Sequence, residues 1–461
     1  MHIHILGICG TFMGGVAALA KDLGHRVSGS DLMMYPPMST QLKRLGVHCY
    51  QGYDRKNIDD DVDLVVIGNV MSRGDELVEW LLNSDIPYCS GPEWLANFVL
   101  KDRWVIALSG THGKTTTSSM VAWILDYAGL DPGFLIGGVP ENFKVSARLG
   151  TSNYFVIEAD EYDTAFFDKR AKFMHYRPKT LAITNIEYDH ADIYPDIDSI
   201  IKQFTHLIRT VPSNGMIVIN HQDSNVKKVL GSGYWSKVET FSNIQKSANW
   251  YGAYDLIGVK SKFSVSRDEQ KIAEVSWALL GTHNLENALV AIACATSIGL
   301  SVDESTKALS KFKGVKRRLE KKGVFAGVHV FDDFAHHPTA IKHTIEGLKA
   351  LVGNARLLVA LEFRSNSMKN GSHTETLKAS LEGADEIHLL IPIGMNWNPR
   401  EYFSELEYRV YFYDSIESLA KNMADNSKNN DHILIMSNGD FGGLSRLLTQ
   451  ALQSKLPGAT S

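Results

Sequence analysis

Residues 104–116 read Trp104-Val105-Ile106-Ala107-Leu108-Ser109-Gly110-Thr111-His112-Gly113-Lys114-Thr115-Thr116, and they carry the strongest indication of the fold of this chain. Its apolar start predicts a buried strand, and residues 116–127 carry apolar side chains at helical spacing. The turn between them has two glycines followed by Lys-Thr, the arrangement of a phosphate-binding loop. Glycines let backbone N–H groups approach phosphate oxygens, and a helix N-terminus adds partial positive charge. We therefore predict that ATP binds to Gly110, Thr111, His112, Gly113, Lys114, Thr115 and Thr116.

Two side chains of this turn have separate expected roles. Lys114 would bridge the β- and γ-phosphates, and the hydroxyl of Thr115 would ligate Mg²⁺. The standard pattern has glycine where this chain has Leu108, so a strict pattern search would miss the loop. The alternative is a chance lysine in a strand-to-helix turn, and the coincidence of strand, glycines, Lys-Thr and helix argues against it.

Two other predicted strands end in polar residues that would complete a metal site. Residues 153–157 lead into Glu158-Ala159-Asp160-Glu161, and residues 181–184 are followed by Asn185-Ile186-Glu187-Tyr188-Asp189-His190. In open α/β sheets the carboxyl ends of the strands face the ligand crevice. We expect Glu158 and His190, together with Thr115, to hold one or two Mg²⁺ ions. For either motif by itself, a solvated turn at a strand end is the alternative.

Strands and helices alternate in three successive blocks, which predicts an α/β protein of three consecutive domains. We place a Rossmann-like domain at residues 1–102, a P-loop ATPase-like domain at 103–313 and a second Rossmann-like domain at 314–461. Residues 231–278 of the middle block read as antiparallel strands and turns. The third block would open with a linker made of the basic run 316–318 and a turn near Gly323.

Composition narrows the class of function. The 461-residue chain has a formal net charge of −5, so it has no global field that attracts nucleic acid or anionic lipid. Its four cysteines form no C-x-x-C pair, which argues against a zinc site and fits a reducing cytosol. The N-terminus lacks the features of a signal peptide, and no apolar run reaches the ~20 residues of a membrane span. We expect a cytoplasmic protein with small-molecule partners, no nucleic acid and no membrane insertion.

The motifs above, with three later ones, resemble the Mur ligase family of ATP-dependent peptidoglycan-precursor ligases. The later motifs are Gly281-Thr282-His283-Asn284-Leu285-Glu286-Asn287, Arg317-Arg318-Leu319-Glu320 and Asp332-Asp333-Phe334-Ala335-His336-His337-Pro338-Thr339. The family's P-loop also lacks the distant glycine. The resemblance implies that Asn284, Asn287, Arg318 and Asp333 contact ATP, and that Lys114, Glu158 and His190 are catalytic.

Within that family, the chain resembles the branch that extends UDP-N-acetylmuramate. Stretches that carry this likeness are 7–15, Tyr35–Thr40, Glu161–Arg170, Arg364–Lys369 and Met436–Gly443. The implied reaction joins L-alanyl-γ-D-glutamyl-meso-diaminopimelate to UDP-N-acetylmuramate through an acyl phosphate, in peptidoglycan recycling. The alternative is addition of L-alanine to the same acceptor. An insertion around Asp168–His175, which alanine-adding members do not carry, favours the tripeptide.

Resemblance and position also suggest where the two other substrates bind. The UDP-sugar would contact Gly10, Gly14, Ser30, Asp31, Ser72 and Arg73. The peptide would contact Arg364, Asn366, Lys369, Ser437 and Asn438, since an arginine can clamp a carboxylate with two hydrogen bonds. For Arg73 a solvated loop arginine is nearly as good an explanation.

Two other classes of function stay open at this point. A nucleotide switch would use the P-loop without needing an amine, and an NAD(P)-dependent oxidoreductase would use the N-terminal glycines. The spacing Gly7-x-x-Gly10-x-x-x-Gly14 is not that of a dinucleotide-binding turn, so the second signal is weak. The third residue of the peptide (lysine or diaminopimelate), the tolerance for longer peptides, the preferred metal, lysine carbamylation and the oligomeric state are left open.

Overall fold

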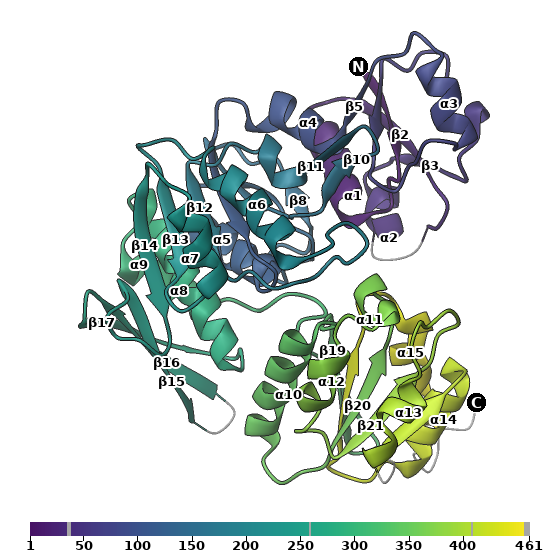
Figure 1. Ribbon diagram of the computed structural model, residues 1–461, viewed down its shortest axis with the longest axis vertical. Coiled ribbons are helices and arrows are strands. Elements are labelled where there is room, and N and C mark those ends of the chain that lie inside the picture. The colour runs from purple at the N-terminus through teal and green to yellow at the C-terminus, as the bar shows by residue number, and fades with distance from the viewer. Residues whose placement is uncertain (35–37, 258–259, 407–408, 456–461) are drawn as a thin grey trace.

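The computed structural model describes residues 1–34, 38–257, 260–406 and 409–455. Residues 35–37 of the Tyr35–Thr40 stretch lie outside the described part. Three α/β units follow one another along the chain, each with its own sheet, as Figure 1 shows. The predicted fold class is confirmed. Within the described part, no helix combines the length and the apolar character needed to cross a bilayer.

The N-terminal unit has a five-stranded parallel sheet in the order β3-β2-β1-β4-β5. Its strands are β1 (His2–Leu6), β2 (Arg26–Asp31), β3 (His48–Gln51), β4 (Leu64–Ile67) and β5 (Tyr88–Ser90). Its helical elements are α1 (Thr11–Asp22), α2 (Met38–Arg44), η1 (Arg55–Asn57), α3 (Glu76–Leu82), α4 (Gly91–Leu95) and η2 (Ala96–Leu100). The glycine-rich turn after β1 places the N-terminus of α1 at the carboxyl edge of this sheet, where ligands bind in such folds.

The middle unit is built on a ten-stranded sheet in the order β17-β16-β15-β14-β13-β12-β6-β9-β7-β8. The strands are β6 (Trp104–Ser109), β7 (Gly133–Leu135), β8 (Ala147–Arg148), β9 (Tyr154–Glu158), β12 (Thr180–Ile183), β13 (Met216–Asn220), β14 (Lys237–Ser242), β15 (Trp250–Ile257), β16 (Lys260–Arg267) and β17 (Gln270–Trp277). The helices are α5 (Lys114–Tyr127), α6 (Ile197–Ile208), α7 (Ser224–Gly231), α8 (Thr282–Ser297) and α9 (Val302–Leu309). Apolar residues of α5, α8 and α9 share one cluster, and those of α6 and α7 belong to another.

One strand of this sheet differs from the sequence prediction. β15, β16 and β17 form the expected antiparallel meander, but β14 pairs in parallel with β13. The helix α7 between β13 and β14 carries the chain back across the sheet, and such a crossover produces a parallel pair. The prediction of antiparallel strands throughout residues 231–278 was therefore wrong for β14.

The C-terminal unit has a six-stranded sheet in the order β18-β19-β23-β20-β21-β22. The strands are β18 (Glu320–Phe325), β19 (Val328–Asp333), β20 (Leu357–Glu362), β21 (Glu386–Leu390), β22 (Val410–Tyr413) and β23 (His432–Met436). The helical elements are α10 (Pro338–Val352), α11 (Asn366–Asn370), α12 (Thr374–Ser380), α13 (Pro399–Tyr402), η4 (Ser404–Leu406), α14 (Ile416–Asn426), η5 (Phe441–Gly443) and α15 (Leu444–Gln453). The predicted turn near Gly323 was wrong, because Gly323 lies inside β18 beside a register shift. The hairpin turn follows at Ala326 and Gly327, both at positive φ.

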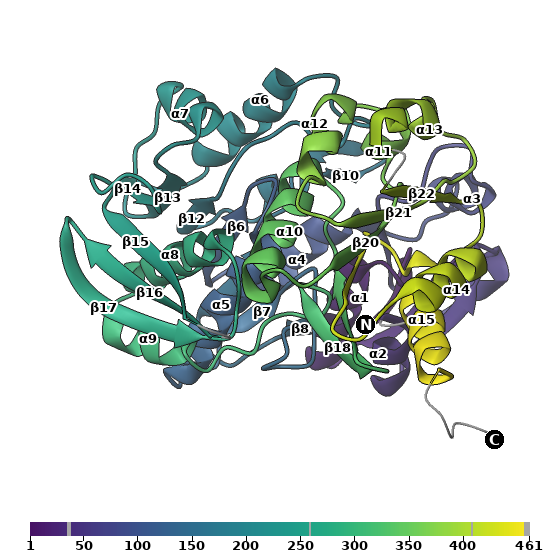
Figure 2. The ribbon, with the colours of Figure 1, turned by 90° about the horizontal axis from the view of Figure 1, so that it is seen from below.

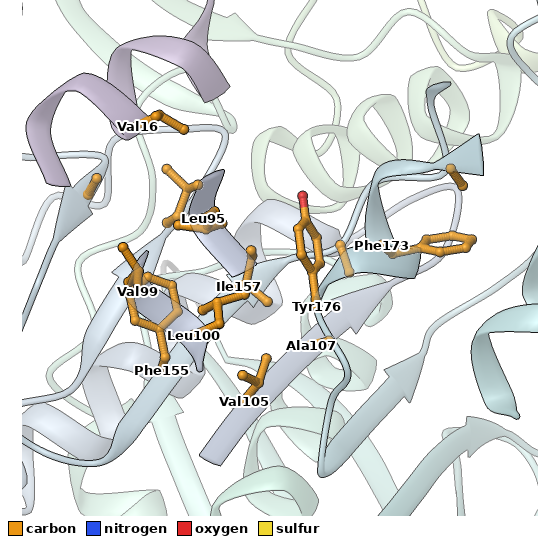
Figure 3. Packing of buried hydrophobic residues seen from close by; sticks show 14 of the residues in the cluster. Val16, Leu95, Val99, Leu100, Val105, Ala107, Phe155, Ile157, Phe173 and Tyr176 are labelled. Carbon is orange, nitrogen blue, oxygen red and sulfur yellow. The ribbon is translucent and has the colours of Figure 1, made fainter. Parts of the chain in front are cut away.

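The N-terminal and middle units share one hydrophobic core. Val16 of α1, Leu95 of α4 and Val99 belong to the same buried cluster as Phe155 and Ile157 of β9, as Figure 3 shows. The C-terminal unit has two clusters of its own. Figure 2 views the molecule from the side of this unit. A shared core resists relative movement between the N-terminal and middle units.

The predicted insertion forms a hairpin on the N-terminal unit. β10 (Asp163–Ala165) pairs antiparallel with β11 (Asp168–Ala171), and η3 (Lys172–His175) follows. At its tip, Phe166 packs against a cluster of the N-terminal unit, and the Phe167 ring lies edge-on to Tyr88 with centroids 5.4 Å apart. The hairpin thus ties the middle unit to the N-terminal one.

Candidate active site

The P-loop conformation requires its two glycines. Gly110 has φ +127°, and a Cβ there would lie 2.2 Å from Thr184 Oγ1. Gly113 has φ +86°, and a Cβ there would lie 2.5 Å from Asn287 Oδ1. Both positions therefore exclude side chains by conformation and by space.

The end of β12 holds the P-loop in place. Thr184 Oγ1 donates to the His112 carbonyl at 2.6 Å, and the His112 N–H donates to Asn185 Oδ1 at 2.8 Å. The Thr111 N–H donates to the Asn185 carbonyl at 3.0 Å. The loop is thereby fixed before any nucleotide arrives, which lowers the ordering cost of binding.

Lys114, at the first turn of α5, is paired with carboxylates. Its Nζ lies 2.7 Å from Glu161 Oε2 and 3.5 Å from Asp160 Oδ1. Burial alone would lower the pKa of Lys114, but the charges of Glu161 and Asp160 outweigh it and hold the pKa above its usual value. Lys114 therefore carries a positive charge at neutral pH.

Glu158 lies where the sequence predicts it, against the P-loop. Its Oε1 accepts from Thr115 Oγ1 at 2.9 Å, and its Oε2 accepts from the Gly137 N–H at 2.7 Å. Arg318 of the C-terminal unit donates to the same Thr115 hydroxyl at 3.2 Å. Burial raises the pKa of Glu158 above its usual value, with Lys114 acting in the opposite direction. Thr115 and Glu158 thus present oxygen atoms to one small space.

His190 faces the other carboxylates of the same motif. Its Nε2 lies 3.3 Å from Glu161 Oε1, and its backbone has φ +56°. Burial lowers the pKa of His190, but the hydrogen bond to Glu161 and the charges of nearby acids raise it by more. The pKa of His190 is therefore above its usual value, at about 9. Donor atoms of Asp160, Glu161 and His190 lie within 4.8 Å of one another. Sequence reasoning assigned no role to Asp160 and Glu161, although their place in Glu158–Glu161 was a usable signal.

Other expected ATP contacts surround the loop. Asn287 Oδ1 accepts from Thr117 Oγ1 at 3.0 Å, and Asn284 Nδ2 donates to the Leu280 carbonyl at 2.7 Å. Asp333 accepts from the Leu319 and Ala335 N–H groups at 2.6 and 2.7 Å. Asn284, Asn287, Arg318 and Asp333 line a cavity of about 1640 Å³, which is also lined by residues 111–116 of the P-loop, Glu158 and His190.

Polar contacts dock the C-terminal unit over this cavity. Thr339 Oγ1 donates to Glu187 Oε2 at 2.7 Å, and the same oxygen lies 3.3 Å from His112 Nε2. Ser367 Oγ donates to Asp189 Oδ1 at 3.0 Å. Burial would raise the pKa of Glu187, but its hydrogen bond to His112 and nearby charge lower it to about 2. Sequence reasoning assigned none of these docking residues except His112.

Two of the residues predicted for the UDP-sugar line a second cavity of about 450 Å³ in the N-terminal unit. These two are Gly10 and Asp31, and Asp31 Oδ2 accepts from the Cys9 N–H at 2.8 Å. Gly14 lines neither cavity, and a Cβ there would come within 2.3 Å of Met38 Cε. The small cavity meets the large one at residues 9–12 and Lys172, which line both.

The other three predicted UDP-sugar contacts lie elsewhere among the described residues. Ser30 is buried and its Oγ lies 3.0 Å from His4 Nε2. Arg73 Nε donates to Glu79 Oε1 at 2.8 Å, and the Ser72 N–H donates to Asp75 Oδ2 at 2.8 Å. None of the three lines either cavity. Local bonds account for the side chains of Ser30 and Arg73.

The residues predicted for the peptide come from two segments of the C-terminal unit, the loop and helix α11 after β20, and the loop after β23. Arg364 lies against Gly439, where a Cβ would come within 2.2 Å of its guanidinium. Ser437 Oγ bonds to Glu362 and accepts from the Gly439 N–H at 2.9 Å. Asn438 lines the large cavity, and its buried Oδ1 has no hydrogen-bond partner among the described residues. Asn366 and Lys369 lie on α11, outside the cavity lining.

Three α/β units lie around a P-loop cavity that shares part of its wall with a second cavity, an arrangement suited to an enzyme that uses ATP on a second ligand. Three family models match the chain: Mur ligase family, catalytic domain (residues 2–103), Mur ligase middle domain (108–295) and Mur ligase, glutamate ligase domain (317–439).

Individual relatives agree with these matches. The chain is 49% identical over 460 residues to the UDP-N-acetylmuramate–L-alanyl-γ-D-glutamyl-meso-2,6-diaminoheptandioate ligase of Escherichia coli (strain K12), with 100% of both chains covered. It is 34% identical to the UDP-N-acetylmuramate–L-alanine ligase of Acetivibrio thermocellus, covering 76% of this chain and 73% of that one. A crystal structure of a murein peptide ligase from Psychrobacter arcticus is 44% identical, covers 99% of each chain and has a TM-score of 0.77.

The chain belongs to the Mur ligase family. It is therefore an ATP-dependent ligase that forms an amide bond. The switch and oxidoreductase interpretations of the sequence are set aside by this membership.

Proposed function

We propose that the protein joins L-alanyl-γ-D-glutamyl-meso-diaminopimelate to UDP-N-acetylmuramate with ATP, in peptidoglycan recycling in the cytosol. The observation that carries the proposal is the full-length identity of 49% to an E. coli ligase named for these substrates. The two cavities support it, because they meet at residues 9–12. A sugar nucleotide with its diphosphate at the start of α1 would extend toward the P-loop.

The acidic residues beside the P-loop fit Mg²⁺. The hydroxyl of Thr115 and the carboxylates of Glu158, Asp160 and Glu161 offer the oxygen donors that this ion prefers, and His190 adds one nitrogen. When bound, Mg²⁺ would supply positive charge for the phosphate oxygens. Burial raises the pKa of Glu158 even though Lys114 lowers it, so further positive charge beside this carboxylate would favour its charged form.

The chain's own groups would serve the first chemical step. The lactyl carboxylate attacks the γ-phosphorus, an acyl phosphate forms, and the bond to the departing ADP oxygen breaks. The P-loop N–H groups and Lys114 would hold the phosphates in line, after Lys114 exchanges Glu161 for a phosphate oxygen. Arg318, which reaches Thr115 from the C-terminal unit, would add charge once that unit is docked.

In the second step the neutral α-amine of the peptide attacks the acyl carbon. The amide bond forms, phosphate leaves, and the amine gives up a proton. An acyl phosphate is lost to water in an open site, so the C-terminal unit would need to cover it. The bonds of Thr339 to Glu187 and of Ser367 to Asp189 are among the contacts that would hold this unit in place over the site.

The peptide would enter from the C-terminal unit. Arg364 is shaped against Gly439 and offers a fork that matches a carboxylate. Asn438 offers at the cavity wall a buried oxygen without a partner in the part of the chain that the structure describes, suited to an N–H donor of the peptide. Asn366 and Lys369 on α11, and Ser437 directly after β23, would complete the site.

A single assay separates the tripeptide from L-alanine. Purified protein with ATP, Mg²⁺ and UDP-N-acetylmuramate receives one of the two amines, and phosphate release is followed. We expect release with the tripeptide and background with L-alanine, and mass spectrometry would show the UDP-muramyl tripeptide. Faster release with L-alanine would establish the alternative reaction. Omission of the acceptor is the control for idle ATP hydrolysis.

A further inference from the structure

Lys172 occupies the junction of the two cavities. It is the first residue of η3, directly after the hairpin formed by β10 and β11. Both cavities are lined by residues 9–12 and Lys172, and Lys172 is the member of this shared wall that carries a charge. Its side chain is 12% exposed. A lysine so enclosed needs an anion to offset the loss of hydration.

The anions that Lys172 meets are few. Its Nζ lies 3.3 Å from Asp160 Oδ2, above the rings of Phe12 and Tyr162 at 5.7 and 5.2 Å. An ammonium has three donors, and among the described residues Asp160 is the acceptor that its Nζ contacts. Asp160 is itself shared, because its other oxygen lies 3.5 Å from Lys114. Lys172 therefore retains hydrogen-bonding capacity toward the cavities.

The hairpin fixes Lys172 against the N-terminal unit. Phe166 and Phe167 anchor the tip of the hairpin, as described above, and the Lys172 N–H donates to the Tyr162 carbonyl at 2.9 Å. Asp168, at the start of β11, accepts from Arg170 and lies 3.1 Å from His175 Nε2. The position of the ammonium is thus set by the middle and N-terminal units, which share a core.

We propose that Lys172 binds the lactyl carboxylate of UDP-N-acetylmuramate and positions it for attack on the γ-phosphate. This inference rests on the proposed function. A diphosphate at Gly10 and a reacting carboxylate at the P-loop place the sugar across the junction that Lys172 occupies. An ammonium with spare donors recognises a carboxylate by charge-assisted hydrogen bonds. The insertion would thereby give the enzyme a cation for its acceptor.

The same ammonium would also suit the diphosphate, and two ligands distinguish these sources. UDP-N-acetylmuramate carries the lactyl carboxylate, whereas UDP-N-acetylglucosamine has the same diphosphate without it. Titration calorimetry with each ligand is performed on wild type, Lys172→Met, Lys172→Gln and Lys172→Arg. Lys169→Met is the matched control, because Lys169 lies on the same hairpin, pairs with Asp163 at 2.6 Å and is 69% exposed.

We expect the methionine and glutamine variants to bind UDP-N-acetylmuramate roughly ten- to a hundredfold more weakly, the usual range for a lost bond to a charged group. Their affinity for UDP-N-acetylglucosamine would change less than about twofold. Arginine would restore most of the loss, and Lys169→Met would bind both ligands as wild type does.

Equal weakening for the two ligands would assign Lys172 to the diphosphate and overturn the inference. Unchanged affinity for UDP-N-acetylmuramate would overturn it as well. If the methionine variant fails to fold, the glutamine variant decides, because it keeps a donor for Asp160. Failure of the wild type to bind UDP-N-acetylmuramate would instead refute the proposed function.

Discussion

Lys114 Nζ lies 2.7 Å from Glu161 Oε2, so the lysine expected to bind the triphosphate forms an ion pair with a carboxylate of the same site. Glu161 also contacts His190, at 3.3 Å. One buried carboxylate therefore orients both a phosphate-binding cation and a candidate metal ligand. Nucleotide and Mg²⁺ would arrive together, because the metal can take the carboxylate that Lys114 leaves.

Replacing Lys114 by alanine should abolish ligation while sparing the sugar-nucleotide site. Loss of a preorganised cation in the transition state should lower kcat by roughly a thousandfold or more. Binding of UDP-N-acetylmuramate should change by less than about twofold, since Lys114 lines the large cavity and not the small one. Phosphate release and calorimetry provide the two measurements.

The control for that variant is Lys421→Ala, at an exposed position on α14. It should turn over as the wild type does. Wild-type turnover by the Lys114 variant would refute the P-loop assignment. Circular dichroism is needed beside both, because removing Lys114 leaves Glu161 and Asp160 without their cation.

Gly113→Ala should lose nucleotide affinity. The left-handed backbone costs an alanine about 1 kcal/mol, and its Cβ would collide with Asn287 Oδ1 at 2.5 Å. Gly129→Ala is the control for the cost of the left-handed backbone without a collision, because Gly129 also has a positive φ but a Cβ there would meet nothing within 4 Å. We expect about tenfold weaker ATP binding in the first variant and none of this loss in the second, by calorimetry. Equal ATP affinity in both would show that the clash is relieved.

The sequence predicts the fold class well because its signals are local. The P-loop joins a strand and a helix that are adjacent in the chain, and alternation of strands and helices predicts parallel sheets. β14 was misjudged because its pairing depends on how the short helix α7 crosses the sheet. Gly323 was misjudged because glycine marks a bulged strand as well as a turn.

The site is predictable where its parts follow strand ends. Glu158 is the last residue of β9, and Thr115 follows the end of β6. The two side chains meet because β9 and β6 are parallel neighbours in the sheet. The partner of His190 could not be deduced, since all three acids of Glu158–Glu161 satisfy the same pattern. Contacts such as Thr339 to Glu187 join residues 152 positions apart, and no local pattern announces them. The contact of Arg73 is local instead, because Arg73 forms an ion pair with Glu79, six residues along the chain.

Thr339→Val should loosen the closed arrangement. Valine has the shape of threonine but cannot donate to Glu187, and the lost bond to a charged acceptor is worth about 1.5–3 kcal/mol. Small-angle scattering should show a larger radius of gyration than in the wild type. Thr376→Val is the control, because Thr376 Oγ1 donates at 3.3 Å to His373 within the same unit. An unchanged radius for Thr339→Val would show that other contacts hold the unit.

Glu286 makes stability depend on pH. It lines the large cavity, and burial raises the pKa of its carboxyl to about 7 in the folded protein. In the unfolded chain the pKa of Glu286 is about 4.3. Between this value and about 7, the folded protein therefore binds the proton of Glu286 more tightly than the unfolded chain does. Below the pKa of the unfolded chain, Glu286 is protonated in both states and does not lower the free energy of unfolding. As the pH rises from there to about 7, the loss of free energy of unfolding due to Glu286 grows, and above about pH 7 it reaches its full value.

Glu286→Gln should consequently stabilise the protein at pH 8 by up to about 3 kcal/mol, because the amide never has to ionise in a buried place. The gain should shrink as pH falls and disappear near pH 4.5. Urea unfolding of both proteins between pH 4.5 and 8 measures this difference. Glu375→Gln, at an exposed position on α12, should show no such trend. A gain for Glu286→Gln that is the same at every pH would mean that packing, and not the charge of Glu286, is responsible.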